Sequence, residues 1–173
     1  MKSLVEHLSS YATYHRDKRN IATHLVGIPM IVVGTQAVLA RVGFGPLNAA
    51  VGATALASRY YRKLDPELGK VMTTALGATC VLGNGIAAMP MPVWAVASTS
   101  LFVGGWALQF LGHKFEGKKP AFLDDLASLW IGPLFIAAEV AFALGHAPEL
   151  RAEIERAAGP THWGTPAPLA TAA

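Results

Sequence analysis

Three polar residues at helical spacing mark residues 106–121, WALQFLGHKFEGKKPA, as a place where this chain could carry out chemistry. Gln109, His113 and Glu116 fall at positions i, i+4 and i+7, which share one face of a helix that continues through Gly112. Gln109 lies within an apolar run, and the other two lie at its edge. Polar groups at such depth are costly and commonly pair, bind a ligand or react. This face is therefore the candidate site.

The composition indicates an integral membrane protein. Of 173 residues, 53% are hydrophobic and only 14% are charged, whereas soluble domains carry about a quarter. The length predicts a single helical membrane domain over residues 1–158, followed by a disordered Pro-, Ala- and Thr-rich tail over residues 159–173. The net charge is +3, but no basic polar face is present, which excludes nucleic acid as a partner. The single cysteine, Cys80, excludes an internal disulfide and a cysteine-type zinc site.

Hydrophobic patterning predicts an all-α bundle of four to five membrane-embedded helices, preceded by a short amphipathic helix within residues 3–18. His15 ends the apolar face of that first helix, and Asn20 is the expected N-cap of the next. The fifth run is ambiguous, because Pro133 and Glu139 suit a crossing, a re-entrant or a packed segment alike. The apolar runs are residues 21–40, 44–60, 71–89, 93–111 and 123–145.

Basic residues give the expected orientation. If the first four runs each cross, the basic clusters share one side, and the positive-inside rule makes that side cytoplasmic. The short loops favour a bacterial-type inner membrane. Runs two and three are rich in Gly and Ala, so they could pair subunits of a homo-oligomer as readily as helices of one chain. The clusters are Arg16, Lys18 and Arg19; Arg59, Arg62, Lys63 and Lys70; and Lys114, Lys118 and Lys119.

This topology brings four candidate ligands to the cytoplasmic edge of the membrane: His15, His24, His113 and Glu116. His15 and His24 are nine residues apart and would point in opposite directions on one unbroken helix. The charged break between them lets both turn inward. Three imidazoles at one depth suggest a site for Fe, Zn, Cu or Ni, and the carboxylate could be a ligand or could orient an imidazole.

Other functions stay open on the residue pattern alone. The three histidines could be interfacial, and Gln109 could join helices by a hydrogen bond, which would make the chain a non-catalytic membrane scaffold or a small transporter without a metal site. A transport path, however, should place polar groups at the membrane midplane. A di-iron hydroxylase or desaturase would carry HxxxH and HxxHH boxes, which the six histidines do not form. A zinc hydrolase is a further alternative.

Three ordered motifs between about residues 11 and 145 resemble the Mpo-type 2-hydroxy fatty acid dioxygenases, a family of small multi-pass membrane proteins. The first is Tyr11-x2-Tyr14-His15-x4-Asn20-x3-His24-x2-Gly27-x-Pro29. The second is Trp106-x2-Gln109-Phe110-x-Gly112-His113, followed by Phe115-Glu116 and Pro120-Ala121. The third is Gly132-Pro133-x-Phe135-x3-Glu139. The segment between His113 and Pro120 is one residue shorter here than in fungal members.

The resemblance implies an Fe(II)-dependent enzyme that uses O2 to remove one carbon from a long-chain 2-hydroxy fatty acid within the membrane lipid. The product would be a fatty acid, or its aldehyde-level equivalent, one carbon shorter. His15, His24 and His113 are the implied iron ligands, and Glu116 completes the shell or orients a ligand. Residues expected to contact the ligands or the substrate are Asn20, Gln109 and Glu139, with Lys114, Lys118 and Lys119 attracting the carboxylate. Three histidines match no motif: His7, His146 and His162.

Overall fold

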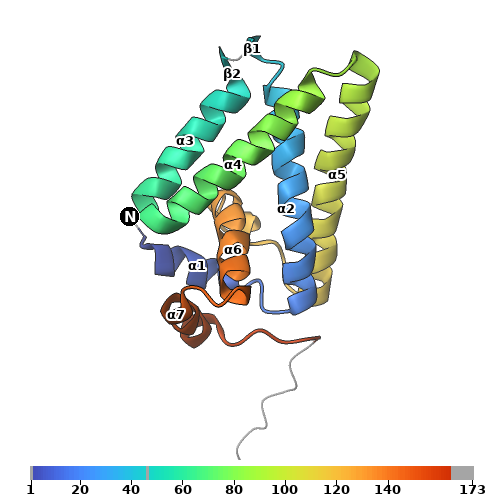
Figure 1. Ribbon diagram of the computed structural model, residues 1–173. Coiled ribbons are helices and arrows are strands. Elements are labelled where there is room, and N and C mark those ends of the chain that lie inside the picture. Colours follow the sequence, from blue (N-terminus) through green and yellow to red (C-terminus); the bar gives the residue numbers. More distant parts are fainter. Residues whose placement is uncertain (1, 46, 165–173) are drawn as a thin grey trace, which may run out of the picture.

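The computed structural model describes residues 2–45 and 47–164, and it confirms an all-helical chain (Figure 1). The one β-sheet in the described part is a hairpin of two strands with two residues each, in which Gly43 lies opposite Asn48 and Phe44 lies opposite Leu47. The elements in order are α1 (Leu4–Ala12), α2 (Lys18–Leu39), β1 (Gly43–Phe44), β2 (Leu47–Asn48), α3 (Ala49–Leu64), α4 (Pro66–Ala87), α5 (Met91–Glu116), the 3-10 turn η1 (Ala121–Leu123), α6 (Ser128–Ala143) and α7 (Pro148–Ala158).

Helix α2 begins at a different cap from the one predicted. Asp17, not Asn20, is the N-cap, and its side chain accepts a hydrogen bond from the Arg19 amide at 2.9 Å. An acidic N-cap side chain accepts a hydrogen bond from an otherwise unpaired backbone amide, and its negative charge interacts favourably with the positive end of the helix dipole. Asn20 therefore lies inside the first turn of α2, where its side chain is free to make tertiary contacts.

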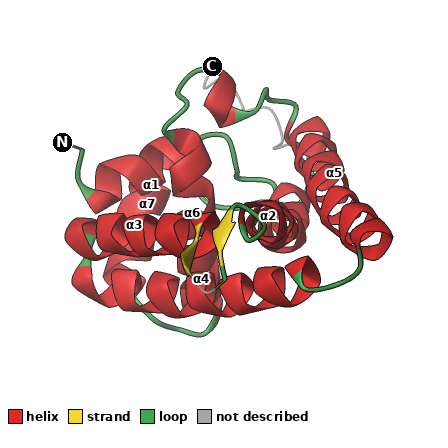
Figure 2. Cartoon of the chain, turned by 90° about the horizontal axis from the view of Figure 1, so that it is seen from above, coloured by secondary structure: helices red, strands yellow, loops and turns green. Residues whose placement is uncertain are grey.

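Helices α2 and α5 pack against each other along small residues spaced by seven. Gly27 and Gly34 on α2 face Gly105 and Ser98 on α5, and Gly112 lies against the first turns of α2. A Cβ atom added to Gly105 would lie 2.7 Å from the Gly27 carbonyl oxygen, so the two backbones approach too closely for any side chain. Close backbone approach through small residues is typical of helix pairs in lipid. The pair forms one side of the bundle, as seen from above in Figure 2.

The remaining helices form the main hydrophobic core beside this pair. Helices α3 and α4 form a hairpin, while α1, α6 and α7 gather near the end of the bundle where α2 begins (Figure 1). Buried side chains from all of these helices join one cluster around Phe135 and Tyr61. The Tyr61 hydroxyl donates a 2.6 Å hydrogen bond to the Trp130 carbonyl oxygen, which fixes α3 against α6.

Two of the described helices, α2 and α5, are long and apolar enough to cross a membrane. A third span is added if α6 and α7, bent by 119° at their junction, are counted as one. The predicted four to five membrane-embedded helices are thus not confirmed. Helix α3 has only 16 residues, because the first residues of the run that starts at residue 44 form the hairpin. It also includes the basic residues Arg59, Arg62 and Lys63.

The start of the predicted tail contacts the bundle. The His162 carbonyl accepts a hydrogen bond from the Lys18 amide at 2.8 Å, and the His162 amide donates to the Arg16 carbonyl at 2.9 Å. These bonds place the chain after α7 beside the first turn of α2. The rest of the predicted disordered tail, residues 165–173, lies outside the described residues.

Candidate metal centre

Three histidines from three separate segments converge where α2 begins and α5 ends. His15 lies in the turn after α1, His24 in the second turn of α2, and His113 in the last turn of α5. One ring nitrogen of each lies within 4.8 Å of the others, and all three residues are buried. The helix is interrupted at residues 13–17, and this interruption lets His15 and His24 turn toward each other, as the sequence predicted.

Backbone carbonyls orient two of the rings. His15 Nδ1 lies 2.8 Å from the Tyr11 carbonyl oxygen, and His24 Nδ1 lies 3.0 Å from the Asn20 carbonyl oxygen. A carbonyl can only accept, so Nδ1 carries the hydrogen and Nε2 presents a lone pair in the neutral ring. The two Nε2 atoms face each other at 3.1 Å. This is the arrangement of metal-binding histidines, whose second nitrogen is commonly held by a backbone oxygen.

The environment of His15 and His113 also fits a metal ion. Burial, followed by the neighbouring His24, lowers the pKa of His15 well below its usual value, so the ring stays neutral at physiological pH. His113 Nδ1 is buried and has no hydrogen-bond partner among the described residues. Such an unpaired nitrogen is costly unless it binds something. Three neutral imidazoles suit Fe, Zn, Cu or Ni and leave coordination positions open.

Close packing brings His113 to the other two histidines. A Cβ added to Gly112 would lie 2.2 Å from Thr23 Oγ1 and 2.4 Å from Asn20 Oδ1. A side chain at position 112 would displace those of Thr23 and Asn20, because the end of α5 lies directly against the first turns of α2. Sequence reasoning missed this role, although the spacing of seven residues that links Gly105 to Gly112 could have revealed it.

Glu116 lies outside the group of three converging histidines. Its carboxylate accepts hydrogen bonds from the Arg16 amide at 3.0 Å, the Asp17 amide at 2.9 Å and the Asn20 side-chain nitrogen at 3.0 Å. These contacts place a negative charge at the start of α2. Because the Asn20 carbonyl orients His24, Glu116 supports a candidate ligand indirectly, through Asn20.

The variant Glu116→Gln tests this role. We expect it to lower the free energy of unfolding by about 1–2 kcal/mol, because the acceptor loses its charge, while the protein keeps its full metal content. Thermal unfolding of the metal-free protein in detergent, together with metal analysis after reconstitution, would measure both quantities. A folded variant that no longer binds metal would restore Glu116 as a ligand.

Glu139 pairs with Arg16, a residue that the sequence analysis treated only as a membrane-flanking charge. Their side chains lie 3.5 Å apart and are 16% and 6% exposed, respectively. The Arg16 guanidinium also donates to the carbonyl oxygens of Ala12, His15 and Gly159. Arg16 thus fixes the turn that carries His15, and Glu139 neutralises its charge. The signal in the sequence was the position of Arg16, directly after the candidate ligand His15.

The three lysines after His113 lie at the surface. Lys118 donates to the Thr13 carbonyl and Lys119 pairs with Asp124, so both tie the segment after α5 to neighbouring loops. The Tyr14 hydroxyl donates to the same Asp124 carboxylate at 2.8 Å. Lys114 is exposed. Two of the three predicted carboxylate-attracting lysines therefore have structural contacts of their own.

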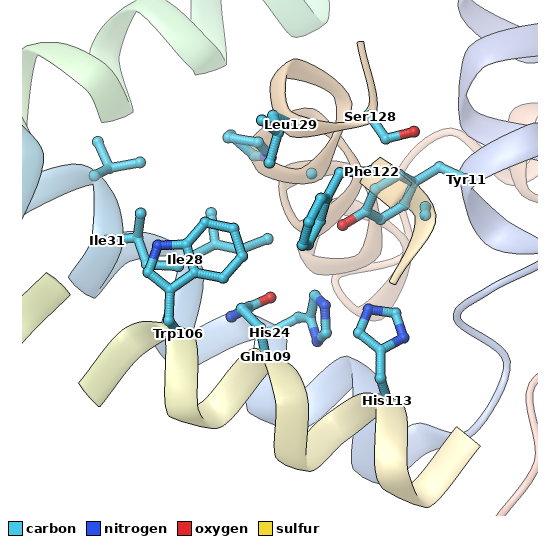
Figure 3. Close-up of a pocket in the computed structure, with 14 residues that line it drawn as sticks. Tyr11, His24, Ile28, Ile31, Trp106, Gln109, His113, Phe122, Ser128 and Leu129 are labelled. Atoms are coloured by element: carbon cyan, nitrogen blue, oxygen red, sulfur yellow. The ribbon is translucent and has the colours of Figure 1, made fainter. Parts of the chain in front are cut away.

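An apolar cavity of about 90 Å³ begins at His24 and His113 and runs between α2, α5, η1 and α6 (Figure 3). Gln109 is buried and lies beside His24 and Trp106, as the shared face of α5 predicts. Tyr11 stacks on His15 with ring centroids 4.1 Å apart, and its hydroxyl points toward the cavity. The cavity thus has polar groups next to the histidines and apolar walls beyond them.

Comparison with known proteins identifies the family. Residues 1–144 match the family model described as 2-hydroxy-palmitic acid dioxygenase Mpo1-like. This chain belongs to the Mpo1-like family. A curated member, 2-hydroxy-palmitic acid dioxygenase MPO1 of Saccharomyces cerevisiae, is 30% identical over 151 residues, which cover 86% of this chain and 85% of the relative. No solved structure matches. The family matches confirm the resemblance that the three motifs indicated.

Proposed function

We propose that this protein is an Fe(II)-dependent 2-hydroxy fatty acid dioxygenase that removes one carbon from its substrate with O2. The observation that carries the proposal is the convergence of three buried imidazoles, two of them oriented by backbone carbonyls, at the polar end of an apolar cavity. The yeast relative, named for action on 2-hydroxy-palmitic acid, supports the substrate class. Overall, the 2-hydroxy acid and one molecule of O2 give the shortened fatty acid, CO2 and water.

His15, His24 and His113 would hold the iron. When bound, iron would supply O2 activation, which side chains alone cannot provide, and it would keep positions open for small ligands. The protein contributes fixed geometry: Tyr11 and Asn20 hold the first two rings through their carbonyl oxygens. These bonds hold the two donor nitrogens in a fixed orientation, so the donors are preorganised.

The cavity residues orient the acid. The Gln109 amide and the Tyr11 hydroxyl are placed to contact the polar head of the substrate, where a carboxylate and a hydroxyl need hydrogen-bond donors. Trp106 and Phe122 meet edge to face with centroids 5.3 Å apart. These rings form an apolar wall that keeps water from the carbons that react.

Membrane association follows from the substrate and from the two apolar helices. A long-chain acid partitions into lipid, and α2 and α5 are suited to cross it. We place the site near the membrane face that carries the basic clusters, because the start of α2 and the end of α5 lie together (Figure 1). A bacterial-type inner membrane with the site at its cytoplasmic edge remains our proposal, as does further packing of α3 and α4 within the lipid.

The test uses full-length protein purified in detergent, stripped by a chelator and reconstituted anaerobically with Fe(II). We expect about one iron per chain and O2 uptake with 2-hydroxypalmitate but not with palmitate, which lacks the 2-hydroxyl group. Mass spectrometry should find an acid one carbon shorter.

Two results would contradict the proposal. Absence of iron would favour a membrane scaffold or transporter without a metal site. Turnover supported by Zn(II) without O2 would indicate a hydrolase.

A further inference from the structure

A second apolar groove lies on the other side of the cavity wall. It is formed by α2, α4 and α6 and has a volume of about 290 Å³. Thr79 is the one residue with a polar side chain among those that line it. The groove opens at the surface between Leu25, Val71 and Val140, which are 37%, 54% and 46% exposed. The groove is therefore apolar and opens onto an apolar part of the protein surface.

The groove and the cavity share a wall. Ile28 and Val32 of α2 and Pro133 of α6 line both spaces. The wall has no polar side chain, and Pro133 has no backbone N–H to bury. An alkyl chain that passes between the two spaces therefore leaves no polar side chain unpaired. Gln109 and Tyr11 lie near the histidines in the cavity (Figure 3), whereas the groove is lined almost entirely by apolar residues, so the two ends of this path differ in polarity.

The size of the first cavity calls for a second space. A cavity needs about 10–15 Å³ of volume for each water-sized group that it holds, and a methylene group is of similar size. The 90 Å³ cavity next to the histidines then holds roughly six to nine such groups. A long-chain acid with its head at the histidines has more methylene groups than that, and the adjoining groove is the larger space.

We propose that this groove binds the distal part of the acyl chain and that residues of α4 and α6 on its walls set the accepted chain length. The proposal rests on the proposed function, since it assumes that the acid head lies at the histidine cluster. A chain bound this way enters sideways from the lipid between α4 and α6. Met72 and Ala75 of α4 then contact the substrate although they lie on a helix that contributes nothing to the metal centre.

The first test narrows the groove with Ala75→Phe. Ala75 lines the groove at the surface of α4, so a larger side chain can be accommodated without disturbing the core. We expect kcat/KM for 2-hydroxypalmitate to fall about tenfold or more, while the value for 2-hydroxyoctanoate changes less than about twofold. The matched control is Val81→Phe, because Val81 is on the same helix, is 73% exposed and does not line the groove. Equal loss on both acids, or no change on either, would overturn the proposal.

The second test does not require turnover. A 2-hydroxypalmitate analogue with a photoreactive diazirine at its methyl end should label the α4 segment 71–79 in wild-type protein. Unlabelled 2-hydroxypalmitate should compete, and Ala75→Phe should remove the label. Labelling that palmitate and phospholipid displace equally well would indicate an ordinary lipid site, and labelling at another face would place the chain elsewhere. Either result contradicts the proposal. If the wild-type protein shows this labelling but no O2 uptake, the proposed function fails and the groove assignment stands.

Discussion

Replacing His113 by alanine should abolish iron binding and turnover while leaving the metal-free protein folded. The ring supplies one of three converging nitrogens. With two donors left, the affinity for Fe(II) should fall by more than about a hundredfold, and O2 uptake should drop below detection. His113 Nδ1 makes no hydrogen bond among the described residues, so its loss leaves no partner unpaired. We therefore expect the free energy of unfolding to change by less than about 1 kcal/mol beyond the cost of the small cavity.

Metal analysis after anaerobic reconstitution and thermal unfolding in detergent would measure these two effects separately. The control is His146→Ala, because His146 is exposed and matches no motif. It should keep both iron and activity. A folded His113→Ala protein with wild-type iron content would remove His113 from the metal centre and, with it, the main support for the proposed function.

Replacing Gly112 by alanine should disturb the packing of α5 on α2 directly beside the metal centre. The new Cβ would lie 2.2 Å from Thr23 Oγ1 and 2.4 Å from Asn20 Oδ1, so these side chains must move or the two helices must separate. We expect a loss of about 1–3 kcal/mol of stability. Because either movement disturbs the contact between the segments that carry His24 and His113, iron affinity should fall as well, without the loss of any ligand.

Gly77→Ala provides the matched control. Gly77 lies inside α4, and a Cβ there would meet nothing within 4 Å. The helix preference of alanine then predicts a change of about 1 kcal/mol toward greater stability. Thermal unfolding and iron titration of both variants test the pair. If Gly112→Ala is as stable as Gly77→Ala, the close contact of the two helices does not position the metal centre.

The amino-acid sequence by itself determined the elements that carry the site. The low content of charged residues and the long apolar runs indicate membrane helices, because a helix satisfies its own backbone hydrogen bonds within lipid. The i, i+4, i+7 spacing correctly put Gln109 and His113 on one face, and the helix does continue through Gly112. The charged break after α1 also correctly predicted that His15 and His24 could turn toward each other. These are local properties of the chain, so neighbouring residues suffice to reveal them.

The tertiary structure decided which polar groups meet. Glu116 shares the predicted depth of the histidines, yet it bonds to the amides before α2, and Glu139 pairs with Arg16. A carboxylate binds whichever donors the fold brings nearest, and depth in a membrane does not specify the nearest donor. Asp17 likewise replaced Asn20 as the cap, and the β hairpin took residues that the sequence analysis had placed in the run of α3. The separation of ligands from supporting groups depends on contacts between α2 and α5, and those contacts exist only in the folded bundle.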